Sequence, residues 1–165
     1  MPIEYIIKSK MIQGAGGNKI WENEDFVVTT INVPHIDKYD GGHITIRTKV
    51  PVSSITQLSD DLLLKLFKLV GYCETALLKT MNKQGIETPF TNNMDNGNWA
   101  VFANKPKTMH IHIYGRAKNS VKQTFGQALY FPDPNSGFYD NHTPLNEQDI
   151  QSIKCLIEKN YISKT

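Results

Sequence analysis

The stretch TMHIHIYGR, residues 108–116, places two histidines, His110 and His112, on either side of one isoleucine. Its polar and apolar residues alternate with the period of two that indicates a β-strand. Because successive side chains on a strand point to opposite faces, Thr108, His110 and His112 share one face and the apolar residues share the other. We expect the apolar face to be buried and the histidine row to lie on the opposite surface, where it can meet a ligand.

The histidine pair has three interpretations. Two imidazoles so close on one face disfavour each other's protonation, which keeps at least one of them neutral at pH 7. A neutral imidazole is a nucleophile, a general base or a metal ligand, so the pair is catalytic, metal-binding or simply part of a strand. A metal would need a third ligand. The candidates are a carboxylate or one of the other histidines, His35, His43 and His142.

The charges around the pair are unevenly distributed. Between Asn96 and Pro132 the sequence has no aspartate or glutamate. The same interval contains five basic residues, Lys105, Lys107, Arg116, Lys118 and Lys122. Its local field favours an anionic ligand such as a phosphate, unless the charges are clustered by chance on a solvated face. With a phosphate bound, one histidine would attack phosphorus while its neighbour and the cations stabilise the equatorial oxygens.

Outside this stretch, the pattern predicts further strands and a long helix. Two β-rich runs, residues 26–33 and 43–50, form a hairpin-like pair, and the second alternates as a half-buried strand does. The helix begins after the capping residue Ser59 and ends at Gly85. Its predicted buried face consists of Leu63, Leu66, Phe67, Val70, Cys73, Ala76, Leu77 and Met81. Gly71 inside the helix indicates close packing.

A last helix starts with Asn146 as its cap. Mostly consecutive strands with a few helices indicate an α+β domain around an antiparallel sheet, and 165 residues suit one domain.

No run approaches the roughly 20 apolar residues of a membrane span, so we expect no membrane contact and a cytoplasmic location. The net charge of +2 is too small for nucleic-acid binding. Cys73 and Cys155 lack metal or redox spacing and are expected to be reduced.

The order of these features resembles that of the histidine-triad family of nucleotide hydrolases and transferases. In that family three histidines alternate with apolar residues, and an arginine often follows after a turn, as in TMHIHIYGR. The stretch KIWENEDFVVTTINVPHIDKYDGGHITIRTKVP, residues 19–51, is similar to the family's opening hairpin, with its acidic turn and its Gly-His pair ahead of an apolar strand. The resemblance covers roughly residues 19–116. It implies one domain over residues 1–165, with residues 117–165 as a C-terminal extension of loop and helix.

The resemblance also implies roles for the residues of the signature strand. With the family's arginine aligned on Arg116, its central nucleophilic histidine falls on His110 and its third histidine on His112. The first histidine falls on Thr108, which is a departure. That position helps mainly by orienting the nucleophile, partly through its backbone carbonyl, which threonine keeps. A second alignment makes His110 the first histidine, His112 the nucleophile and Tyr114 the third position, but the Gly-Arg pair fits the first alignment better.

Nucleotide or phosphate binding is implied for further positions. These are His43, Thr108, Asn96, Asn98, Asn32 and Arg116. His43 falls near the phosphates in the family, although it is also an ordinary residue for the start of a strand. One of Asn96 and Asn98 matches a phosphate-side asparagine, or both belong only to the turn. The family's Gly-Gln-Ser/Thr run is replaced by FANKPKT, residues 102–108, which leaves the substrate specificity open.

The implied activity is hydrolysis or transfer at the α-phosphate of a nucleoside phosphoramidate or dinucleoside polyphosphate. His110 would form a nucleotidyl-histidine intermediate, and His112 would hydrogen-bond the phosphoryl oxygens. This mechanism needs no metal or other cofactor, and the family commonly forms homodimers. The turn-rich segment TFGQALYFPDPNSGFYDNHTP, residues 124–144, would close over the site or join the dimer. Two alternatives are a non-catalytic nucleotide-binding module, which the Thr108 departure favours, and a metal-dependent enzyme that uses the histidine pair as ligands.

Overall fold

The computed structural model of the protein describes residues 17–96 and 109–162, with the backbone alone for Asp95 and Asn96. Thr108 and Asn98, two of the residues assigned to nucleotide binding, lie outside these ranges.

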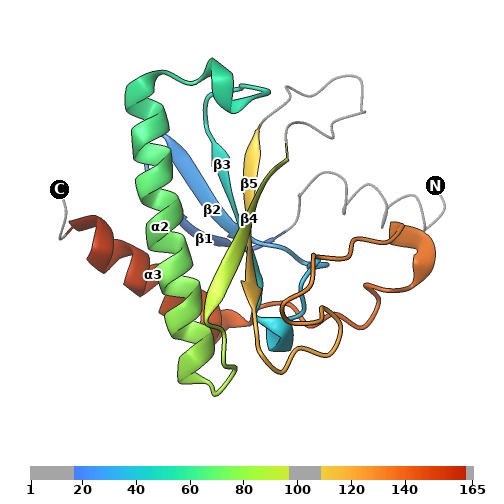
Figure 1. Cartoon of the computed structure of the whole chain (residues 1–165). Coiled ribbons are helices and arrows are strands. Elements are labelled where there is room, and N and C mark those ends of the chain that lie inside the picture. The colour runs from blue at the N-terminus through green and yellow to red at the C-terminus, as the bar shows by residue number, and fades with distance from the viewer. Residues whose placement is uncertain (1–16, 97–108, 163–165) are drawn as a thin grey trace.

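A five-stranded sheet and two α-helices form the described part of the chain (Figure 1). The strands are β1 (Lys19–Glu22), β2 (Phe26–Thr30), β3 (His43–Thr48), β4 (Phe90–Asn96) and β5 (His110–Arg116). The helices are α2 (Asp60–Lys83) and α3 (Glu147–Ile162). The strand order is β1-β2-β3-β5-β4, and all neighbouring strands are antiparallel. The α+β class predicted from the sequence is therefore confirmed. No helix in the described ranges has the length and apolar character that a bilayer crossing requires.

The hydrophobic core lies between one face of the sheet and the two helices, and Figure 1 shows α2 running along that face. The strands contribute alternate residues to it, namely Ile20, Val28, Ile44, Ile46, Ile111 and Ile113. The helices contribute Leu66, Leu69, Cys73, Leu77, Ile153 and Ile157, among others. The alternation of β5 is therefore as predicted, with its isoleucines on the core side.

The long helix differs from its prediction in two places. Ser59 caps it as expected, by accepting a hydrogen bond from the backbone N–H three residues later (3.3 Å), and Gly85 follows its end with a φ of 79°. Phe67, however, is 57% exposed, whereas Leu69 is 1% exposed and occupies the core. The buried stripe is thus rotated from the predicted one. A Cβ added to Gly71 would meet nothing within 4 Å, so this glycine does not mark close packing.

The opposite face of the sheet carries the histidine row, and it is not the open surface that the sequence predicts. His43, His112 and Tyr114 are each at most 3% exposed. The chain between β5 and α3, residues 117–145 and here called the extension, lies on this side of the sheet (Figure 1). The ring of Phe131, within it, is centred 5.4 Å from the ring of Tyr114. For this reason β3 is buried along almost its whole length rather than half-buried.

Two glycines bring the turn before β3 against the end of β5. Gly41 has a φ of 124°, a value that side chains rarely adopt. A Cβ on Gly115 would lie 2.0 Å from the carbonyl oxygen of Gly41, so both positions require glycine. This approach places Asp40 beside the extension. Its buried carboxylate accepts hydrogen bonds from the three backbone N–H groups of residues 121–123, each 2.8 Å long.

Candidate active site

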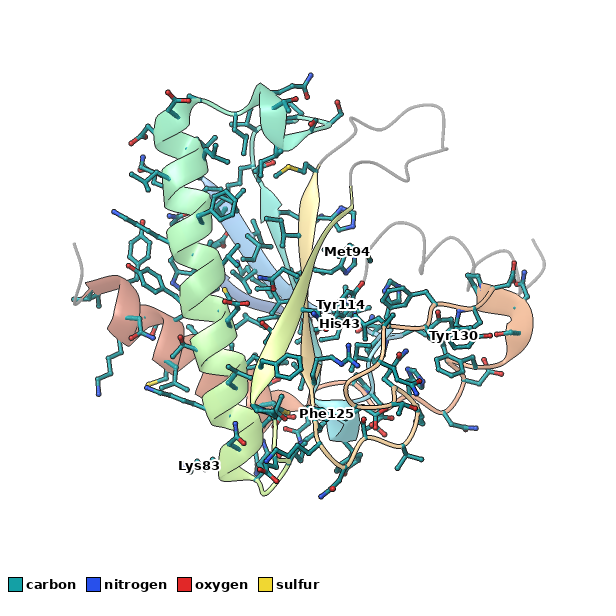
Figure 2. The ribbon with its side chains drawn as sticks, viewed as in Figure 1. His43, Lys83, Met94, Tyr114, Phe125 and Tyr130 are labelled. Carbon is teal, nitrogen blue, oxygen red and sulfur yellow. The ribbon has the colours of Figure 1, made fainter. Side chains whose placement is uncertain are left out.

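Three histidines from separate parts of the chain meet on the covered face of the sheet. His43 is the first residue of β3, His112 is the third residue of β5, and His35 comes from the loop after β2. The ring centroids of His43 and His112 are 5.0 Å apart, and that of His35 lies 5.0 Å and 5.3 Å from them. Figure 2 shows His43 next to Tyr114 on the side of the sheet away from α2. The hydroxyl of Tyr114 is 3.0 Å from Nδ1 of His35.

A directed chain of hydrogen bonds joins these residues and assigns their tautomers. The backbone N–H of His35 donates to Nδ1 of His43 (3.1 Å), so that nitrogen carries no proton. The proton of neutral His43 is then on Nε2, which donates to Nδ1 of His112 (2.7 Å). Neutral His112 must therefore carry its own proton on Nε2. That nitrogen is buried and has no hydrogen-bond partner among the described residues.

Burial keeps all three imidazoles neutral at pH 7. Burial, and then the nearby His110 and His142, lower the pKa of His35 to about 4. Burial and the surrounding histidines hold the pKa values of His43 and His112 well below the usual 6.5. The neutral forms match the directed chain, because a second proton on His112 would place two N–H groups face to face. The cluster can therefore present the Nε2–H of His112 as a donor to a ligand.

His110 lies at the more exposed end of the same row. It is half-buried, whereas His112 is 3% exposed. The rings of the two residues meet edge to face with their centroids 4.7 Å apart. The pair predicted from TMHIHIYGR thus consists of two unequal members. His112 is held within a hydrogen-bond chain, and His110 is the more accessible.

The cluster can also be tested as a metal centre, because one nitrogen each of His35, His43 and His112 lies within 4.8 Å of the others. A metal-bound histidine normally carries a proton on its second nitrogen and donates it. In His43 that second nitrogen is an acceptor, so ligation would require an imidazolate. The 2.7 Å between His43 and His112 is also shorter than the roughly 3.3 Å that separates two nitrogens bound to one tetrahedral zinc. The arrangement of His35, His43 and His112 therefore does not match a preformed tetrahedral zinc site.

Arg116, expected to bind phosphate, has three protein acceptors. Its guanidinium donates to Oδ1 of Asn92 (2.7 Å) and to the carbonyl oxygens of Thr124 (3.0 Å) and Gln127 (2.8 Å). These bonds fasten the start of the extension to the end of β5. Phosphate binding by Arg116 remains a prediction, and the contacts give this side chain a structural role.

The other residues predicted to bind nucleotide or phosphate lie at different distances from the histidine row. His43 lies within the row beside two other histidines, and its role in phosphate binding stays a prediction. Asn32 is exposed in the loop after β2. Asn96 pairs with His110 in the register of β4 and β5, which places it beside the row, although its side chain is not described.

Two residues near the row, His35 and Arg47, were not predicted from the sequence to be catalytic or phosphate-binding. His35 entered only as a possible metal ligand, and it comes from an irregular loop that has no periodicity. Arg47 lies on β3 directly opposite His110. The sequence could have placed Arg47 on the histidine face, because it lies four residues after His43 on an alternating strand.

Comparison with known proteins identifies the fold. Neither the protein-family models nor the curated proteins include a match to this sequence. Among solved structures, a histidine triad protein from Marinobacter aquaeolei is similar with a TM-score of 0.60 and 13% identity, over 99% of this chain and 98% of that one. A zinc-bound histidine triad family protein from Mycobacterium smegmatis gives 0.56 and 16%, over 96% of each chain. A uridylyltransferase mutant gives 0.53 and 17%, over 94% of this chain and 50% of the other.

Proposed function

The chain has the histidine-triad fold, and we propose that it binds a nucleotide through its phosphates at the histidine row and acts at the α-phosphate by hydrolysis or transfer. One observation carries the proposal: a half-buried histidine lies beside a second histidine whose free N–H is fixed by a hydrogen-bond chain. A nucleophile next to an N–H donor is the arrangement that in-line attack on a phosphoryl group requires. The fold is consistent with this chemistry.

The tautomer of His112 favours His110 as the nucleophile. A nucleophilic imidazole needs a lone pair on the attacking nitrogen. The hydrogen bonds from His35 to His43 and from His43 to His112 leave His112 with its proton on Nε2. This nitrogen can donate a hydrogen bond, but it has no lone pair with which to attack. This supports the alignment in which His110 attacks and His112 binds a phosphoryl oxygen. The second alignment, with Tyr114 in the third position, would require His112 to attack through Nε2, which carries the proton.

The proposed reaction proceeds in two displacements. A ring nitrogen of neutral His110 forms a bond to the α-phosphorus, and the bond from phosphorus to the leaving group breaks. The leaving group keeps the bonding electrons and takes up a proton from water. In the second step water attacks the same phosphorus, loses a proton to the solvent and releases a nucleoside monophosphate and neutral His110. Throughout, Nε2–H of His112 donates to an oxygen whose negative charge grows in each transition state.

Mass spectrometry tests the intermediate directly. The protein is incubated with adenosine and guanosine phosphoramidates and with dinucleoside polyphosphates, quenched and digested with trypsin. His110 and His112 fall on one peptide, residues 108–116, and fragmentation distinguishes them. We expect a nucleotidyl group on His110. The variant His110→Ala should lose the adduct and at least about a thousandfold in turnover, because the nucleophile is absent.

The other outcomes separate the alternatives. An adduct on His112 would select the second alignment. Tight nucleotide binding with neither adduct nor turnover would identify a non-catalytic binding module, in line with the threonine at position 108. Unchanged turnover in His110→Ala would refute the proposed mechanism. The homodimer implied by the resemblance stays a prediction, which sedimentation equilibrium can test on the same preparation.

A further inference from the structure

Arg47 occupies a place on the sheet where it can contact the same ligand as His110. The two residues are direct partners in the register of β3 and β5, and both side chains project from the histidine face. Directly opposed residues in an antiparallel pair have their Cβ atoms about 5 Å apart. On its other side Arg47 is paired with Val27 of β2, so no acidic residue flanks it across the sheet.

Among the described residues, Arg47 differs from other buried or half-buried cations in that its Nε has no hydrogen-bond partner. This Nε is buried, and no described side chain forms an ion pair with the guanidinium. By contrast, Lys38 pairs with Asp149 at 2.8 Å and Lys122 pairs with Asp37 at 2.6 Å. A buried N–H donor without an acceptor is costly in a native protein and calls for an explanation.

We propose that Arg47 binds the phosphoryl group that His110 attacks. This inference rests on the proposed function and names a residue that the resemblance did not assign. The Nε–H and one Nη–H of an arginine form a fork that matches two oxygens of one phosphate. Bound in this way, Arg47 supplies the acceptor that its Nε lacks and neutralises charge on the oxygens that do not react. His112 donates to the same group from the buried end of the row.

The contrast with Arg116 supports the assignment. Both arginines lie on the histidine face, but Arg116 is 4% exposed and its donors are occupied by Asn92 and two carbonyl groups. Arg47 is half-buried, like His110, and its Nε has no acceptor within residues 17–96 and 109–162. A ligand that approaches the accessible end of the row therefore meets Arg47 and His110 together.

The test compares nucleoside monophosphates with the matching nucleosides by isothermal titration calorimetry. The wild-type protein should bind one of AMP, GMP, CMP and UMP more tightly than its nucleoside. Arg47→Gln should weaken that monophosphate about ten- to a hundredfold and leave the nucleoside within about twofold. Arg47→Lys keeps the charge but loses the fork, so its affinity for the monophosphate should lie between those of wild type and Arg47→Gln. Lys68→Gln, which removes a charge from an exposed position on α2, is the matched control and should bind as wild type.

Each outcome has a distinct meaning. If wild type binds a monophosphate and Arg47→Gln binds it equally well, Arg47 is not a phosphate ligand and the proposed function stands. Equal losses for nucleoside and monophosphate would mean that Arg47 acts on the fold, which also overturns the inference. Thermal melting of each variant supports that comparison. If wild type binds none of the four monophosphates, the proposed function and the role of Arg47 fail together.

Discussion

Asp40 fastens the extension over the histidine face, and its replacement by asparagine tests how strongly. The carboxylate is 3% exposed and accepts backbone N–H groups from residues 121–123, one on Oδ1 and two on Oδ2. An asparagine has one oxygen, so its best orientation keeps two of the three bonds. Its amide NH2 then faces the third N–H, and two donors are left opposed.

The magnitude follows from these three bonds. The N–H that loses its acceptor belongs to Val121, which is 89% exposed, so this loss costs only about 1 kcal/mol. Each of the two remaining bonds loses about 1 kcal/mol when its acceptor is no longer charged. Asp40→Asn should therefore lower the free energy of unfolding by about 3 kcal/mol. For a chain of this length the melting temperature should fall by roughly 10 °C.

Urea denaturation followed by circular dichroism measures the loss, and hydrogen exchange of the amides of residues 121–123 locates it. Asp133→Asn is the matched control. Asp133 is exposed and caps a short 3-10 helix in the same extension by accepting one N–H (2.8 Å), and asparagine caps equally well. The control should stay within about 0.5 kcal/mol of wild type. A loss below about 1 kcal/mol in Asp40→Asn, or unchanged exchange at residues 121–123, would refute the account of how the extension is held.

Two further predictions concern pH and the thiols. Because the folded pKa of His35 is about 4 and the unfolded value is about 6.5, the unfolded chain binds more protons between these limits, and stability must fall on acidification. His35 alone should remove about 2 kcal/mol between pH 7 and pH 5, measured by urea denaturation, and His35→Phe should reduce this slope; equal slopes in both proteins would contradict the prediction. Cys73 is in the core, where burial raises the pKa of its thiol, whereas Cys155 is exposed. A thiol reagent should therefore label one cysteine in the native protein and two after denaturation, and fast labelling of both in the native state would show that the core around α2 is wrong.

Much of the fold could be predicted because it depends on local patterns. The alternation in TMHIHIYGR correctly separated the core-facing isoleucines from the histidines, and Ser59 and Asn146 correctly marked the starts of the two helices. The prediction failed at Phe67 and Gly71. Helical periodicity identifies a stripe of apolar residues, but its width allows either of two neighbouring residues to face the sheet, and only packing selects between them.

The sequence by itself determined the strands β2, β3 and β5, the two helices, and which residues share a face with His110, because these follow from backbone geometry and the spacing of side chains. The short strand β1 and the polar strand β4 were not predicted, because neither has a clear alternation of apolar and polar residues. Tertiary structure alone decided that the extension covers this face and that His35 joins His43 and His112. It also decided that Arg116 is occupied, whereas the Nε of Arg47 finds no acceptor in the described part of the chain. Each of these depends on contacts between segments far apart in the chain. The extension and the loop that carries His35 have no periodicity, so their positions come from specific hydrogen bonds such as those of Asp40, which no local pattern encodes.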